Sequence, residues 1–171
     1  DPTISVTNLV MFTRHVAGET SALVARGEDD TLRVVECRLS DHVSGATNIR
    51  DAVNAAMALP ASWRRQMDVV LRTHPLGQAV VGPSGEGANA TARAWAIDLS
   101  EVDDSGEPSL KPQPGVRAHS LQWLPLAAVL EDLRDSQHYT PQCSQALSDA
   151  HQNASQTCLL YTSPSPRDAT L

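Results

Sequence analysis

The amino-acid sequence predicts an α+β domain in which helices flank a mixed β-sheet. Strand-like segments occupy the first part of the chain and return after residue 90. A segment with helical periodicity lies between them, and two further helix-like segments close the chain. Strands around a central helix, followed by helices, are typical of α+β proteins.

The first segments have the composition of strands. Residues 4–13 (ISVTNLVMFT) are rich in β-branched and aliphatic side chains, which predicts a strand. Residues 21–26 and 31–39 are expected to form a hairpin, because residues 27–30 (GEDD) have turn chemistry. Apolar and polar residues alternate in residues 31–39, which predicts one buried face and one solvated face.

The clearest helix is expected at residues 48–59. Thr47 or Asn48 is expected to cap its start, and Pro60 marks its end. Its apolar residues recur at the spacing of a single helix face; they are Ile49, Ala52, Val53, Ala56 and Met57.

The middle of the chain alternates short strands and loops. Residues 67–72 are expected to form a short strand before a loop at residues 74–77, and residues 82–87 (GPSGEG) a flexible loop. Residues 91–99 (TARAWAIDL) predict a buried strand. Residues 100–115 contain four acids, three prolines and two glycines, so we expect a solvated loop there.

The last elements are one strand and two helices. A strand is expected at residues 117–123 and a helix from Pro125, with one apolar face formed by Leu126, Val129, Leu130 and Leu133. The Thr140-Pro141 pair predicts the start of a final helix, because proline is favoured at the first helical position.

The end of the sequence resembles a translated sequencing adapter. Residues 158–168 (CLLYTSPSPRD) back-translate to the mosaic-end and primer sequence of a transposon-based library. We therefore expect residues 158–171 to be a non-native, disordered tail and residues 1–157 to form a single domain. Because Asp1 is not a methionine, we also expect the domain to be a fragment of a longer protein.

Charge and cysteine content limit the partners and the compartment. The formal net charge is −7 and the pI is about 5.2, which disfavours a nucleic-acid partner. No apolar stretch approaches the roughly 20 residues that span a bilayer, so no membrane association is expected. With Cys158 set aside, Cys37 and Cys143 are isolated in the sequence, which favours a reducing, cytoplasmic location.

Two segments resemble Nudix hydrolase domains. The segment ATARAWAIDL, an acidic loop and then VRAHSLQWLPLAAVLEDL is similar to the second half of such domains. There a long strand, a variable loop, a strand ending in Trp-x-Pro-Leu and a helix follow one another, and residues 123–126 (WLPL) carry most of the likeness. The segment DHVSGATNIRDAVNAAM resembles the position of the Nudix box. The resemblance covers about residues 6–133 and implies a Nudix-like α/β/α sandwich.

The box itself has lost its charged residues. With Asp41 at the first glycine of the box, the positions of its acids and its arginine hold Thr47, Ala55, Ala56, Leu59 and Pro60. Asp51 is the only acid between Gly45 and Pro60. The family's pyrophosphate hydrolysis uses Mg²⁺ held by carboxylates of this helix. We therefore expect no catalytic residue, no metal ligand and no cofactor here.

The resemblance and its departures together favour a Nudix-fold domain that has lost catalysis. We expect it to act as a ligand-binding, regulatory or scaffold module, with a small nucleotide-type ligand or a protein as its partner. The candidate ligand-binding residues are His42, Arg72 and Trp95, although the apolar surroundings of Trp95 also suit a core residue. Arg64 and Arg65 are interpreted as a solvated pair.

Two other functions stay open. The first is a divergent Mg²⁺-dependent hydrolase of nucleoside-diphosphate-linked substrates that uses acids outside the box, such as Glu86, Asp98 or Glu101. The second is an unrelated α+β protein-interaction domain that shares only the Trp-Leu-Pro-Leu turn.

A zinc-protease interpretation is disfavoured. Glu19, residues 72–75 (RTHP) and Ser84 are similar to the zinc-site pattern of JAMM metalloproteases. Zinc needs about three protein ligands and an open position. Here Arg72 stands in place of the first histidine and Gly87 in place of the aspartate, so we expect no zinc site.

Overall fold

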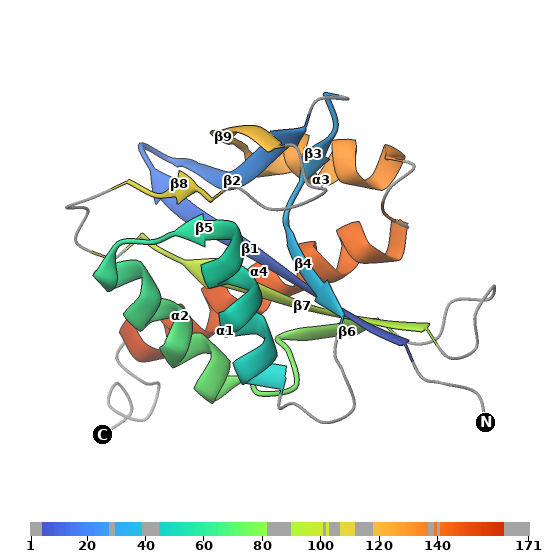
Figure 1. The fold of residues 1–171 in the computed structure, drawn as a ribbon. Coiled ribbons are helices and arrows are strands. Elements are labelled where there is room, and N and C mark those ends of the chain that lie inside the picture. Colours follow the sequence, from blue (N-terminus) through green and yellow to red (C-terminus); the bar gives the residue numbers. More distant parts are fainter. Residues whose placement is uncertain are drawn as a thin grey trace, which may run out of the picture.

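The chain folds into a seven-stranded mixed sheet with helices on both faces (Figure 1). The computed structural model describes residues 5–27, 30–38, 45–81, 90–100, 102, 107–111, 118–136, 139 and 141–162. The α+β class expected from the order of elements is confirmed.

The sheet is organised around β1 (Ser5–Val16). On one side β1 pairs in parallel with β7 (Ala90–Asp98), and on the other it pairs antiparallel with β2 (Glu19–Gly27). β6 (Ala79–Val81) lies antiparallel to β7, and β9 (Ala118–Pro125) lies antiparallel to β2. One parallel pair among antiparallel neighbours makes the sheet mixed, as predicted.

The segment after β2 divides between two partners. β3 (Leu32–Arg33) pairs with the end of β2, whereas β4 (Val35–Arg38) pairs with β1. The expected hairpin of residues 21–26 and 31–39 is therefore only partly correct. Val34 is buried against one face of the sheet and Val35 packs against the core of the other. The expected solvated face is therefore wrong at Val34, which the core on that side of the sheet covers, whereas Glu36 is exposed as expected.

A small two-stranded sheet lies beside the main one. β5 (Met57–Ala58) pairs antiparallel with β8 (Ser109–Leu110), and the Lys111 backbone N–H donates to the Ala56 carbonyl oxygen at 2.9 Å. Residues 100–115 are thus not a plain loop. Main-chain pairing with the segment that follows the first helix holds part of them in place.

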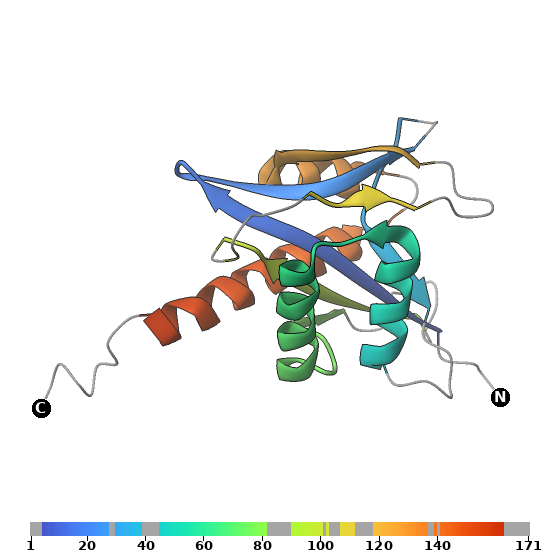
Figure 2. The ribbon, with the colours of Figure 1, turned by 60° about the vertical axis from the view of Figure 1, so that its left-hand side comes forward.

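The helices form the outer layers of an α/β/α sandwich. Figure 2 shows α1 (Gly45–Ala56) and α2 (Ala61–Thr73) upright and side by side against the sheet, with α4 (Pro141–Thr162) crossing behind it. α3 (Leu126–Asp135) packs on α4 and on the β2–β9 side. The sandwich expected from the family resemblance is confirmed.

The apolar stripe of α1 faces the sheet as predicted. Ile49 and Val53 are fully buried, and Met57 just after the helix is 3% exposed. They join one core cluster with Phe12 and Trp95. The helix begins at Gly45, two or three residues before the expected caps Thr47 and Asn48, and ends at Ala56 rather than continuing to residue 59.

The second helix replaces an expected strand. Residues 67–72 belong to α2, whose buried residues are Trp63, Met67, Val70 and Leu71. This spacing of i, i+4, i+7 and i+8 places them on one helix face against the sheet. The strand prediction is wrong because it considered only the short apolar run and missed Trp63 one turn earlier.

The opposite face is covered by α3 and α4. Leu126, Val129 and Leu133 are buried, as are Ala146, Leu147, Ala150 and Ala154 of α4. The predicted starts of both helices are confirmed. α4 continues to Thr162, so residues 158–162 are helical where disorder was expected. No described helix, α4 included, is long and apolar enough to cross a membrane.

Candidate functional site

A charged groove separates the outer sides of α1 and α2. Its volume is about 350 Å³. The residues that line it are Arg50 and Asn54 of α1 and Ala61, Arg64, Arg65, Met67 and Asp68 of α2. We call it the α1–α2 groove.

Helical spacing explains why these side chains meet. Arg50 and Asn54 are four residues apart on α1, and Arg64 and Asp68 are four residues apart on α2, so each pair lies on one side of its helix. The buried stripes turn the remaining surfaces of both helices outward. The polar sides of two neighbouring helices therefore face one groove.

One ion pair crosses the groove. Nε of Arg50 donates to Oδ1 of Asp68 at 2.8 Å, and the two side chains are 41% and 39% exposed. A partly exposed pair of this kind contributes only about 0–1 kcal/mol to stability. Its main consequence is geometric, because it holds the Arg50 guanidinium at the groove.

The groove is locally positive in an acidic protein. Its charged lining residues are three arginines and one aspartate, which leaves two net positive charges. In addition, Nζ of Lys111 donates to the Asn54 carbonyl oxygen at 2.7 Å. At physiological salt, charges beyond about 8 Å are largely screened, so these local charges outweigh the overall −7 inside the groove. Such a groove favours an anion.

The same residues do not fit Mg²⁺, the ion that the sequence resemblance led us to consider. Mg²⁺ takes oxygen ligands in near-octahedral geometry. Asp51, the one acid of α1, is exposed, and the Asp68 carboxylate is paired with Arg50. Across the part of the chain that the structure describes, no three His, Cys, Asp or Glu side chains are grouped closely enough to hold a metal ion.

The structure separates the residues expected to bind a ligand. Trp95 has no exposed surface, and its indole N–H donates to the His74 carbonyl oxygen at 2.8 Å. The interpretation of Trp95 as a core residue is therefore confirmed, and a ligand cannot reach its side chain. Arg72 is exposed near the end of α2, about 10 Å along the axis from Arg65, and does not line the groove. His42 lies outside the described residues.

The other candidate residues do not line the groove or lie outside the described residues. Oδ1 of Asp98 accepts hydrogen bonds from the backbone N–H and the hydroxyl of Ser100 at 2.9 and 2.6 Å. Glu19 is exposed at the start of β2. The proposed acids Glu86 and Glu101, together with Ser84 and the loop at residues 82–87, lie outside the described part of the chain.

Sequence reasoning missed the groove because it missed α2. With residues 67–72 taken as a strand, Arg64 and Arg65 had no helix and no neighbouring Asp68. The signal was present in the spacing of Trp63, Met67 and Leu71, which marks a buried helix face. The three charged lining residues of α2, Arg64, Arg65 and Asp68, occupy the remaining sides of that helix.

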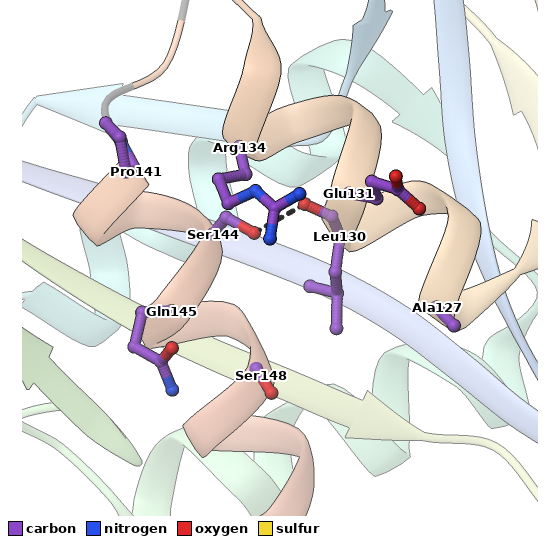
Figure 3. A pocket seen from close by; sticks show the side chains of 8 residues that line it. All are labelled: Ala127, Leu130, Glu131, Arg134, Pro141, Ser144, Gln145 and Ser148. Carbon is purple, nitrogen blue, oxygen red and sulfur yellow. Dashed lines mark hydrogen bonds between the residues drawn. The ribbon is translucent and has the colours of Figure 1, made fainter.

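A second hollow of about 310 Å³ lies between α3 and α4 (Figure 3). Arg134 and Glu131 reach it from α3, and Gln145 and Ser148 from α4. The Ser144 hydroxyl donates to the Leu130 carbonyl oxygen at 2.6 Å and joins the two helices beneath it. Its arginine is matched by a glutamate, so it has no net charge to select an ion.

Comparison with known proteins identifies the fold. No protein-family model matches the sequence, and no curated protein matches it significantly. An Ap4A hydrolase of C. elegans, solved as a binary complex, is structurally similar with a TM-score of 0.53 at 8% identity, over 85% of this chain and 96% of that chain. The NUDIX domain of Shewanella oneidensis NrtR, complexed with ADP ribose, has a TM-score of 0.55 at 11% identity, over 87% of each chain.

A third solved structure agrees. A mutT/nudix family protein from Listeria innocua has a TM-score of 0.53 at 13% identity, over 94% of this chain and 99% of that chain. Identities this low show the fold alone. The chain has a Nudix-like fold, as the sequence resemblance implied.

Proposed function

We propose that this Nudix-fold domain binds a nucleotide-type ligand through the α1–α2 groove without hydrolysing it. The observation that carries the proposal is the lining of the groove. Three arginines line a hollow beside α1, the helix whose sequence resembles the position of the Nudix box. Guanidinium groups match phosphate oxygens in geometry and charge, which is why arginine is preferred for phosphate recognition.

Two further observations support this proposal. Arg50 and Asn54 of α1 line the groove. Asp51 is the single acid of this helix, and it is exposed. A domain of similar fold, that of Shewanella oneidensis NrtR, was solved in complex with ADP ribose. Its ligand carries a diphosphate, the chemical group that the groove suits.

Titration with ADP-ribose and nucleoside triphosphates, with and without Mg²⁺, tests the proposal. We expect binding by calorimetry and no product by chromatography. Mg²⁺-dependent turnover would mean that acids outside the box restore catalysis. Absence of any nucleotide binding would favour a scaffold that binds a protein.

Variants that remove positive charge at different places test the place of binding. The double variant Arg64→Gln/Arg65→Gln should weaken nucleotide binding by at least tenfold, because each charge-assisted hydrogen bond contributes about 1.5–3 kcal/mol. Arg134→Gln, on the far face of the sheet, controls for the loss of charge. Arg72→Gln tests the residue expected from the sequence: a larger effect than that of the double variant would place the ligand at the end of α2.

A further inference from the structure

The ion pair within the α1–α2 groove engages one of its three arginines. Arg50 uses Nε to bond Asp68 at 2.8 Å. A guanidinium has five N–H donors, so its remaining donors stay available at the groove. Asp68 therefore positions Arg50 and at the same time competes with any anion for it.

The other two arginines supply cationic donors without internal competition. Arg64 and Arg65 are exposed at the groove, and within the described part of the chain neither forms an ion pair. Being consecutive on α2, they project about 100° apart around the helix axis, so they reach a ligand from different directions. Together with Arg50 they present only N–H donors, and the side-chain oxygens of the groove are those of Asn54 and Asp68.

This donor set selects against a magnesium-bound phosphate. Mg²⁺ bound to a diphosphate occupies oxygens that guanidinium groups would otherwise bond, and it neutralises two of the negative charges. The groove lacks the carboxylates that would hold the metal in return, since Asp68 is paired with Arg50. A volume of about 350 Å³ is within the range of small-molecule pockets and accommodates a diphosphate.

We propose that the α1–α2 groove binds diphosphate groups as metal-free anions, and that Asp68 is an internal competitor displaced from Arg50 by the ligand. This inference rests on the proposed function and specifies its ligand chemistry. It also sets the domain apart from a metal-dependent site, because added Mg²⁺ weakens binding instead of enabling it.

Inorganic pyrophosphate is the probe that tests this proposal. The full chain is titrated by calorimetry at constant ionic strength, with Mg²⁺ either absent or sufficient to saturate the pyrophosphate. We expect Mg²⁺ to weaken the apparent affinity by about tenfold or more, because charge-assisted hydrogen bonds are lost. This comparison needs no variant, so it does not depend on a mutant that folds.

Two substitutions separate the roles of the ion pair. Asp68→Asn removes the competing charge while keeping the shape, so it should tighten pyrophosphate binding by about threefold to tenfold. Arg50→Gln should weaken it by about tenfold or more. Arg134→Gln, which lies on the other face, should leave it within about twofold, since screening limits long-range effects.

The outcomes distinguish this inference from the function on which it rests. Equal or tighter pyrophosphate binding with Mg²⁺ overturns it, and so does weaker binding by Asp68→Asn. Absence of pyrophosphate binding by a chain that binds ADP-ribose also overturns it and leaves the proposed function intact. Absence of both overturns the proposed function itself.

Discussion

The indole N–H of Trp95, a buried residue of β7, donates to the His74 carbonyl oxygen at 2.8 Å and so anchors the end of α2. His74 follows the last residue of that helix, and the helix carries three of the charged groups of the α1–α2 groove. The residue expected from the sequence to face a ligand thus acts inside the core. It holds in place the element that forms the site.

Replacement of Trp95 by phenylalanine should destabilise the domain. Trp95→Phe removes the hydrogen bond and leaves a cavity, so we expect the free energy of unfolding to fall by about 1–3 kcal/mol. Trp63→Phe is the matched control, since Trp63 is also buried but no indole hydrogen bond is found for it among the described residues. Equal losses in urea unfolding would show that the bond to His74 adds nothing.

Met57→Asp should severely weaken the fold. Met57 is 3% exposed, and an aspartate there would bury a charge without a partner. We expect a loss of about 3 kcal/mol or more in denaturant unfolding. Ala58→Asp places the same charge one residue further along β5, at an exposed position, and should be tolerated. Similar stability of the two variants would contradict the orientation of this segment.

Tyr139 should link stability to alkaline pH. Its hydroxyl lies between β3 and β4, accepting from the Val34 backbone N–H at 3.1 Å and donating to the Val34 carbonyl oxygen at 3.4 Å. Burial, and then the charge of Glu36, raise the pKa of Tyr139 above its ordinary value of 10.0. Above pH 10 the unfolded chain releases this proton and the folded chain keeps it, so stability falls as pH rises.

The comparison with Tyr139→Phe isolates this contribution. At neutral pH we expect the variant to be less stable by about 1–3 kcal/mol, because two buried backbone groups of Val34 lose their partner. Above pH 10 the difference should shrink, since the variant has no proton to release at this position. A constant difference across the alkaline range would rule out the link.

His151 should make stability depend on acidic pH. Desolvation by burial lowers the pKa of His151; nearby Asp98 opposes this shift and His15 adds to it. Its Nδ1 is buried and has no hydrogen-bond partner among the described residues. The unfolded chain therefore binds a proton more readily as pH falls below about 6.5, and stability decreases from there toward the lower folded pKa.

The variant His151→Gln should reduce this dependence. Thermal unfolding followed between pH 8 and pH 5 is expected to show a shallower loss of stability for the variant than for the parent chain. Carboxylates also titrate toward the lower end of this range, so the difference between the two chains is the relevant quantity. Parallel curves would show that His151 does not contribute.

The fold was predictable where local patterns were long and regular. The stripe through Ile49 and Val53 predicted α1, and residues 91–99 predicted the buried strand β7, because periodicity reports burial directly. α2 was missed because the apolar run within residues 67–72, which were expected to form a strand, is too short to distinguish a buried strand from a helix. Val34 was misjudged for a related reason: its burial on the other face depends on the helix layer there, which a local pattern does not show.

By itself, the sequence determined the α+β class, the likeness to Nudix domains and the presence of a single acid on α1. Only the tertiary structure decided where the charges meet. Arg50 and Asp68 are 18 residues apart in the chain and lie on different helices, so no local pattern relates them. They form a site because the apolar faces of both helices pack on the same sheet, which leaves their polar sides facing each other across one groove.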